Sequence, residues 1–296
     1  MQLFSLGTGI GDVLLSTAII RAWRAKHGKQ LPVLTFYPEI FYHNPDILFT
    51  INTSRYQEFL KHFNKPILWR LGNRLHRIVQ QQSIGPNYPF PCRGKHLLDA
   101  MAESMGLSLL PSERQPVIWL SEKEKRAQSR ARGWIAVQSS SNGYWTVNKN
   151  WVPGRMQQVV NELNALGYQL VQLGTREDEA LSGVKDMRGK TSLREAAAIM
   201  ANVEAFIGLE GGLVHLARSV NTKSVVVYTG YTQPEETGYA KNVNLRDTEA
   251  GEGCWRRDLC EHCRKSAEEI TVDMVVEAVS QITDGTTISN IPIVTS

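Results

Sequence analysis

The sequence has none of the features that direct a chain to export or to membrane insertion. It opens on Gln-Leu-Phe-Ser-Leu without a basic segment followed by an apolar one, and no uninterrupted apolar run of about 18 residues occurs in it. Cysteine is scarce, and three of the four cysteines fall within residues 254–263, which is unlike the disulfide framework of a small secreted domain. We therefore expect a globular protein of the reducing cytoplasm.

The sequence also lacks a dinucleotide-binding fingerprint. Its first glycine loop, Gly7-Thr8-Gly9-Ile10-Gly11, does not have the spacing G-x-G-x-x-G, and no acidic residue closes the next apolar run at Phe36. The opening therefore does not fit a dinucleotide-binding fold.

Acidic residues are scarce in the first part of the chain. Residues 1–133 hold 18 Lys and Arg against 9 Asp and Glu, whereas residues 134–296 hold 15 against 20. The basic excess is concentrated in one stretch that contains a single acid, Glu58, and six basic residues, Arg55, Lys61, Lys65, Arg70, Arg74 and Arg77. Such a concentration would attract an anionic partner, although a solvated helix face has the same composition.

Apolar runs alternate with helix-like stretches in two blocks. The first block has strands at 2–6 and 31–36 around a helix that opens at Asp12 and ends at Gly28. The second has strands at 134–138, 168–173, 203–209 and 224–228, with helices at 155–166, 193–201 and 212–220 between them. This alternation predicts an α/β protein with two Rossmann-like, doubly wound parallel-sheet domains that face each other across a cleft. We place them at residues 1–130 and 131–284, and expect a tail at 285–296.

Residues 37–95 show no clear pattern. The apolar runs 47–51 and 67–69 are candidate strands, and 83–94 resembles a loop. We further expect helices at 95–105 and 122–132, a strand at 116–120, and a last helix through Val279.

Residues 206–217, Phe-Ile-Gly-Leu-Glu-Gly-Gly-Leu-Val-His-Leu-Ala, predict a strand that leads directly into a helix. Glycines at this junction let the N–H groups of Gly211, Gly212 and Leu213 approach a phosphate. A plain tight turn with a packed His215 would have the same sequence. In open parallel sheets ligands lie beyond the carboxyl ends of the strands, which favours a nucleotide-linked substrate in the second domain and another substrate in the first.

Four ordered motifs carry a family resemblance. They are Gly11-Asp-Val-Leu-Leu-Ser-Thr-Ala18, Lys149-Asn-Trp-Val-Pro153, Gly189-Lys-Thr-Ser-Leu193 and Glu210-Gly-Gly-Leu-Val-His-Leu-Ala217. Together, from residue 2 to about residue 280, they resemble glycosyltransferase family 9. This family contains the bacterial lipopolysaccharide heptosyltransferases of GT-B fold.

The resemblance implies roles for individual residues. Asp12 matches the family's general base, Lys149 the lysine at the donor diphosphate, and Thr191 the residue near adenine. Two serines match the phosphate loop, and five residues match the motif around diphosphate and sugar: Ser139, Ser140, Glu210, Gly211, Gly212, Leu213 and His215. The family usually has Asp followed by Ser or Thr where this chain has Glu210 and Gly211. Enzymes of this family invert the configuration at the anomeric carbon and require no metal ion.

The chemistry of these residues agrees with such roles, because inverting transfer needs a carboxylate base and cations or N–H dipoles at the leaving diphosphate. Asp12 would also stabilise its own helix as an N-terminal carboxylate. Lys149 would otherwise be a surface lysine, and His215 a packed histidine.

The three clustered cysteines form C-x5-C-x2-C at Cys254, Cys260 and Cys263, with His262 between the last two. Cys260-x2-Cys263 has the spacing of a metal site, whereas a reduced loop is the alternative. Some heptosyltransferases that act on surface proteins are similar in carrying a cysteine-held iron.

The resemblance thus implies a cytoplasmic, inverting GT-B glycosyltransferase that moves a sugar, heptose from ADP-heptose, onto an acidic cell-surface glycan such as the lipopolysaccharide inner core. The acceptor would bind the basic residues Arg55, Lys61, Arg70, Arg74 and Arg77 at the inner membrane face, and no nucleic-acid partner is expected. The alternatives are a non-catalytic or altered-donor sugar-nucleotide-binding protein of the same fold and a nucleotide-sugar epimerase.

Overall fold

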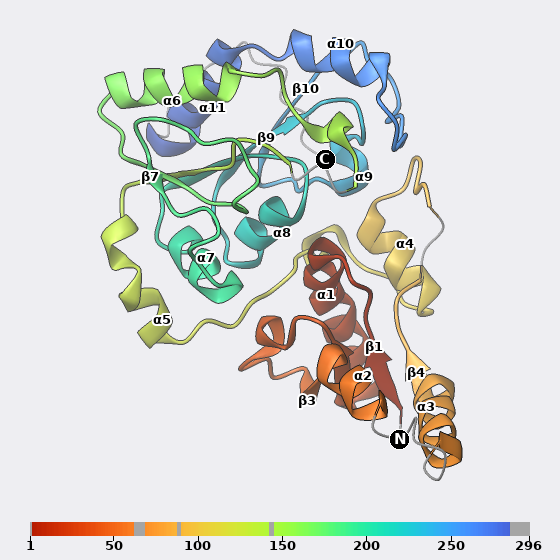
Figure 1. Ribbon diagram of the computed structural model, residues 1–296. Coiled ribbons are helices and arrows are strands. Elements are labelled where there is room, and N and C mark those ends of the chain that lie inside the picture. Colours follow the sequence, from red (N-terminus) through yellow and green to blue (C-terminus); the bar gives the residue numbers. More distant parts are fainter. Residues whose placement is uncertain (1, 62–68, 88–89, 142–144, 285–296) are drawn as a thin grey trace. The chain divides into compact units, whose positions relative to one another are not determined.

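The computed structural model describes residues 2–61, 69–87, 90–141 and 145–284. The chain divides into two compact units, Met1–Tyr88 with Leu98–Trp119, and Pro89–Leu97 with Leu120–Ser296 (Figure 1). Lys65, the end of the serine loop at 142–143 and the expected tail at 285–296 lie outside the described residues. Each unit is built on its own parallel sheet.

The first unit has a four-stranded parallel sheet in the order β3-β2-β1-β4. Its strands are β1 Leu3–Ser5, β2 Leu31–Thr35, β3 Ile47–Asn52 and β4 Ser83–Ile84. The longest helix of this unit, α1 Ile10–His27, follows β1 directly and buries Val13, Leu14 and Ala18 among others. It ends at Gly28, whose φ of 66° favours glycine and whose N–H donates to the Arg24 carbonyl.

The stretch without a clear sequence pattern contains helices that the sequence did not predict. These are α2 Thr53–Lys61 and α3 Trp69–Gln82, so the candidate strand at 67–69 is wrong at Trp69, where α3 begins. The expected helix near residue 95 is α4 Leu97–Ser104. Residues 116–120 form no strand, and the Val117 N–H donates to the Thr17 hydroxyl at 2.8 Å instead of to a neighbouring strand.

The second unit has a six-stranded parallel sheet in the order β10-β9-β8-β5-β6-β7. Its strands are β5 Ile135–Val137, β6 Leu170–Gln172, β7 Lys185–Asp186, β8 Ala205–Leu209, β9 Ser224–Tyr228 and β10 Val243–Arg246. In register, Val137 lies beside Ile207 and Leu209 beside Val227. The chain order reverses direction at β5 and β8, the kind of position where open α/β sheets bind ligands.

Helices cover this sheet on both faces (Figure 1). The helices of this unit are α5 Glu122–Ala127, α6 Arg155–Ala165, α7 Leu193–Met200, α8 Gly212–Ser219, α9 Pro234–Thr237, α10 Glu261–Glu269 and α11 Val272–Asp284. One hydrophobic core of this unit contains Val159 and Leu163 of α6, Val275 of α11, and Ile207 and Val225 of the sheet. A one-turn 3-10 helix, Val147–Lys149, follows β5 after the serine loop.

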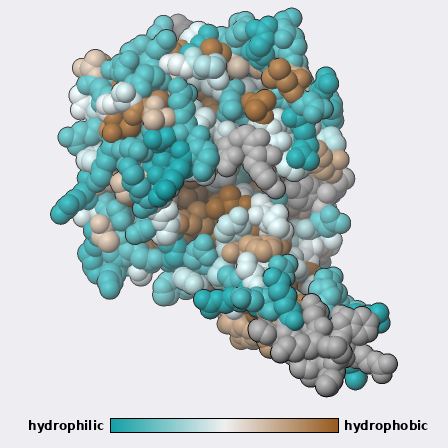
Figure 2. Space-filling model, viewed as in Figure 1, coloured by the Kyte–Doolittle hydropathy of each residue, from teal (hydrophilic) through white to brown (hydrophobic). Residues whose placement is uncertain are grey.

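On the face drawn in Figure 2, hydrophilic side chains predominate over the second unit. Within the described residues, no helix has both the length and the apolar character required to cross a bilayer.

Candidate functional site

The start of α8 is the best-defined element of the candidate site. After β8 the chain passes Glu210 and takes φ 154° and ψ −164° at Gly211, a conformation that only glycine adopts readily, before α8 begins at Gly212. The first hydrogen bonds run from the N–H groups of Val214 and His215 to the Gly211 carbonyl. The N–H groups of Gly212 and Leu213, which come before these donors, thus have no acceptor inside the helix and can bind an anion.

Lys149 lies at this helix start. Its Nζ is 2.7 Å from Glu210 Oε2, and the two side chains are 18% and 8% exposed. The ammonium also lies 5.0 Å from the centre of the Tyr231 ring, and the Tyr231 hydroxyl accepts a 2.7 Å hydrogen bond from Trp145. A largely buried cation is thus held beside the first turn of α8, where both would attract a diphosphate.

His215 projects from the same helix into a buried polar network. Its Nδ1 is 2.8 Å from the Tyr239 hydroxyl. Burial lowers its pKa to about 4, with Glu210 opposing the shift and Lys149 and His96 adding to it. His96 donates its own Nε2–H to the Gly238 carbonyl at 2.9 Å. At neutral pH His215 is therefore a neutral hydrogen-bonding group.

The two serines after β5 already have partners in the protein. The Ser139 hydroxyl donates to the Glu179 carbonyl at 2.6 Å and accepts from Gln172 at 2.9 Å. The Ser140 hydroxyl lies 3.4 Å from Asp178 Oδ1 and accepts from the Glu179 N–H at 3.0 Å. Both serines tie the loop after β6 to the end of β5.

Thr191 is half-buried and lies one residue before the N-cap of α7. Ser192 caps this helix reciprocally with Glu195, whose carboxylate accepts from the Ser192 N–H at 2.8 Å. Thr191 is thus at a different helix start from Glu210 and His215.

Asp12 belongs to the first unit and lies in the first turn of α1. The helix begins at Ile10 with Gly9 as its N-cap, so it does not open at Asp12 as the sequence suggested. A Cβ atom on Gly9 would lie 2.9 Å from Asp12 Oδ2, so the absence of a side chain at Gly9 leaves room for this carboxylate. The helix start stabilises the ionised form of a carboxylate placed there.

The described basic residues of the stretch 55–77 lie on two adjacent helices of the first unit. Arg55 and Lys61 are exposed on α2, and Arg74 and Arg77 are exposed on α3. The rings of Tyr56 on α2 and His76 on α3 stack with centres 6.4 Å apart, which brings the helices side by side. Arg70 lies in α3, but its side chain is outside the described residues.

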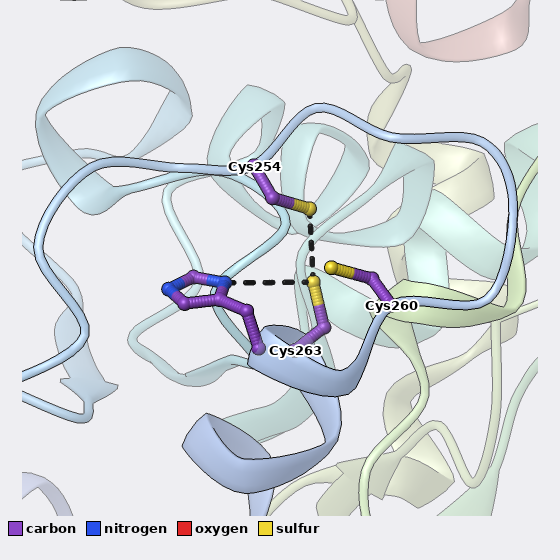
Figure 3. Close-up of side chains that lie close together, drawn as sticks. Cys254, Cys260 and Cys263 are labelled. Atoms are coloured by element: carbon purple, nitrogen blue, oxygen red, sulfur yellow. Dashed lines mark hydrogen bonds between the residues drawn. The ribbon is translucent and has the colours of Figure 1, made fainter.

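The cysteine cluster lies in the second unit, at the start of α10. None of the four cysteines of the chain is in a disulfide. One ligand atom from each of Cys254, Cys260, His262 and Cys263 lies within 4.8 Å of the others (Figure 3). Cys254 and Cys263 approach to 3.0 Å, and the hydrogen bond from Cys263 lowers the pKa of the Cys254 thiol to about 5. A thiolate among further thiols and an imidazole is a set of metal ligands.

Three residues of the site were missed by sequence reasoning. Tyr231 and Tyr239 follow the predicted strand at 224–228, and their position beyond its carboxyl end was a usable signal. Asn148 adjoins Lys149, but nothing in the sequence indicated that its side chain would bind the backbone near the cysteines.

Comparison with known proteins adds a family match. The family model described as glycosyltransferase family 9 (heptosyltransferase) matches residues 95–265. Autotransporter heptosyltransferase Aah from Escherichia coli is 24% identical over 267 residues, which is 86% of this chain. The chain spans 62% of the length of that relative.

Two solved structures are similar over nearly the whole chain. E. coli ADP-heptose LPS heptosyltransferase II has a TM-score of 0.69 at 16% identity and covers 96% of this chain and 99% of its own. The iron-containing dodecameric glycosyltransferase TibC from enterotoxigenic E. coli has a TM-score of 0.68 at 15% identity, covering 97% and 78%. Together with the two observed parallel sheets, these similarities confirm the predicted α/β fold of GT-B type.

Proposed function

The chain belongs to glycosyltransferase family 9, the heptosyltransferases, and from this premise we propose that it is an inverting enzyme that transfers heptose from ADP-heptose to an acidic cell-surface glycan. The family match supports heptosyl transfer. The name of the structurally similar E. coli LPS heptosyltransferase II supports ADP-heptose as the donor.

The observation that carries the proposal is the 2.7 Å pair of Lys149 and Glu210 at the start of α8. The reaction breaks the bond between the anomeric carbon and the diphosphate oxygen, so negative charge grows on the leaving ADP. A preorganised cation and the N–H groups of Gly212 and Leu213 stabilise that charge. Glu210 keeps Lys149 in place before the donor binds, and neutral His215 offers a hydrogen bond without adding charge.

We assign Asp12 the role of general base. Its carboxylate would take the proton from the acceptor hydroxyl while that oxygen forms the new bond to the anomeric carbon. Attack opposite to the leaving diphosphate inverts the configuration. Ser139, Ser140 and Thr191 would shape the donor site through the loop after β6 and the start of α7.

We assign the acceptor to the basic helices of the first unit. Arg55, Lys61, Arg74 and Arg77 are exposed on two helices that lie side by side, and this suits a phosphate-rich glycolipid such as the lipopolysaccharide inner core at the inner membrane face. The four cysteines, none of which is in a disulfide, fit action in the cytoplasm.

The transfer itself, as we propose it, uses no metal ion. The cysteine cluster would be a separate metal site with a structural role. Its ligand atoms lie within 4.8 Å of one another, and a tetrahedral site with sulfur about 2.3 Å from the metal places sulfur atoms about 3.8 Å apart. The four residues could hold such an ion if the distance between Cys254 Sγ and Cys263 Sγ increased from 3.0 Å to about 3.8 Å.

The proposal is tested by incubating the purified chain with ADP-heptose and truncated, heptose-deficient lipopolysaccharide. We expect ADP release that depends on the acceptor, and a product whose anomeric configuration, determined by NMR, is opposite to that of the donor. Tight ADP-heptose binding without ADP release would indicate a binding protein. An isomerised sugar formed without acceptor would indicate an epimerase.

A further inference from the structure

His262 is oriented by a hydrogen bond that fixes its tautomer. Its Nε2 lies 2.7 Å from the Ala250 carbonyl oxygen, which can only accept, so Nε2 carries the proton. The lone pair is then on Nδ1, which lies 4.0 Å from Cys263 Sγ. Metal-binding histidines are held in the same manner, with the second ring nitrogen donating to a carbonyl or carboxylate.

The space for this ring is provided by Gly230. The residue has a φ of 84°, and a Cβ atom there would lie 3.0 Å from His262 Cε1 and 3.1 Å from Ser266. A side chain at position 230 would therefore displace the imidazole. The position of the ring depends on the backbone after β9 and is not an incidental contact of α10.

The segment between the cysteines is bound to the turn that carries Lys149. Asn148, which is 4% exposed, donates from Nδ2 to the carbonyls of Arg256 and Asp258, each at 2.7 Å. Its Oδ1 accepts from the Cys260 N–H at 3.0 Å. One buried amide thus makes three hydrogen bonds to residues 256–260 and is the immediate neighbour of Lys149.

A second set of contacts connects the cysteine loop to Lys149 through Tyr231. The N–H groups of Cys254 and Trp255 donate to the carbonyls of Gly230 and Tyr231, both at 3.0 Å. The Tyr231 ring lies 5.0 Å from Lys149 Nζ. The residue that precedes Lys149 in the chain and the ring that lies over its ammonium are therefore both held by hydrogen bonds to the segment from Cys254 to Cys260.

We infer that His262 completes, through Nδ1, a four-ligand site with Cys254, Cys260 and Cys263 for a thiophilic metal ion of the zinc or iron class, and that the filled site sets donor affinity by holding the Lys149 turn through Asn148. Three sulfurs and one imidazole suit such ions in tetrahedral geometry. The ion joins both ends of loop 254–260, so the loop keeps its carbonyls in place for Asn148. The second part of this inference rests on the proposed role of Lys149 at the donor diphosphate.

Metal content tests the ligand set without reference to activity. The purified chain should contain one equivalent of zinc or iron by inductively coupled plasma mass spectrometry, and His262→Gln should lose most of it. Cys92→Ser is the matched control, because this buried cysteine belongs to the same unit but not to the cluster, and it should keep the metal. Full metal content in His262→Gln, or a Cys254–Cys263 disulfide in the purified chain, would overturn the ligand set.

ADP binding measured by calorimetry tests the coupling. We expect ADP to bind about tenfold more weakly after the metal is removed by a chelator, and affinity to return when zinc or iron is restored. Asn148→Ala should weaken ADP binding similarly while keeping the metal, which separates the coupling from the ligand set. Equal ADP affinity with and without metal would overturn the coupling. If the metal-filled chain did not bind ADP at all, the proposed function would be contradicted. The four-ligand site would then still be judged by the metal content of the wild type and of His262→Gln.

Discussion

The two units hold their cations in opposite environments. In the second unit Lys149 is 18% exposed and is paired with the nearly buried Glu210, whereas Arg55, Lys61, Arg74 and Arg77 of the first unit are exposed on α2 and α3. A buried cation is held in one position, and removing it leaves its buried partner charge uncompensated. Exposed cations are mobile, and salt screens their interactions. Donor affinity should therefore depend strongly on single residues. Acceptor binding should depend on the sum of several exposed charges and change little when one of them is removed.

The largest expected effect separates chemistry in the first unit from binding in the second. Asp12→Asn keeps a side chain that can hydrogen-bond at the start of α1 but cannot accept the acceptor proton. Turnover should fall by about 10²-fold or more. ADP-heptose affinity and the thermal unfolding temperature should stay within error of wild type. Near-normal turnover would remove Asp12 from the mechanism.

The next largest effect should be on donor affinity. Lys149→Ala removes the cation at the start of α8, and ADP should bind about 10- to 100-fold more weakly by calorimetry. Lys223→Ala, at an exposed lysine of the same unit that immediately precedes β9 and lies outside the four motifs, should leave ADP affinity unchanged.

The single variant also leaves Glu210 buried without its partner, which costs stability. The double variant Lys149→Ala, Glu210→Ala removes this penalty and should recover thermal stability without recovering ADP affinity. Recovery of ADP binding in the double variant would show that the single change had acted through folding, and the diphosphate site would then lie elsewhere.

A third, intermediate effect concerns pH. The folded pKa of His215 is about 4, below its ordinary value of 6.5, because burial disfavours the charged ring. The unfolded chain therefore binds a proton more readily, and the stability from this residue is present above pH 6.5 and lost as the pH falls toward 4. Between pH 7 and pH 5 the free energy of unfolding should fall by about 2 kcal/mol on this account.

Urea denaturation followed by tryptophan fluorescence at pH 7 and pH 5 measures this loss. In His215→Gln the difference between the two pH values should shrink by about the same amount. His76→Gln, which changes an exposed histidine of the first unit, should leave the difference as in wild type. An unchanged difference in His215→Gln would mean that His215 titrates normally.

Sequence reasoning succeeded where local pattern and site coincide. The glycines at 211 and 212 marked a strand-to-helix junction, and the structure forms this junction with Lys149 beside it. The start of the first helix was predicted at Asp12, two residues after its observed start at Ile10. The reason is that Gly9 acts as the N-cap and has no side-chain oxygen that would mark the helix start in the sequence. Helix boundaries are seldom specified more sharply than this.

Other parts depended on contacts between distant residues. The basic stretch was expected to lie on a solvated helix or at a ligand, but α2 and α3 themselves were missed. Pro66 and Gly72 were read as breaks in the pattern, although Leu71, Leu75, Ile78 and Val79 have helical spacing. The segment 116–120 has the composition of a strand, but the Val117 N–H donates a hydrogen bond to the Thr17 hydroxyl of α1. The role of Asn148 follows from three hydrogen bonds to residues more than 100 positions away, which no local pattern contains.

The smallest effect should come from the exposed cations. If the basic surface of α2 and α3 binds an anionic glycolipid, the triple variant Arg55→Gln, Arg74→Gln, Arg77→Gln should raise the acceptor KM about threefold at low salt. The dependence of that KM on ionic strength should also become flatter, while ADP affinity stays unchanged. Steady-state kinetics at several salt concentrations measure both quantities.

A matched triple variant of the second unit, Lys123→Gln, Lys241→Gln, Lys265→Gln, removes the same charge from other exposed positions. Exposed charges more than about 10 Å from a ligand are screened at 0.1 M salt, so this control should leave the acceptor KM and its salt dependence as in wild type. If both triple variants gave curves as steep as wild type, α2 and α3 would be an ordinary solvated surface. If both flattened the curves equally, the overall charge of the chain would attract the acceptor, and the contrast between a specific donor site and a cumulative acceptor surface would no longer be a contrast between the two units.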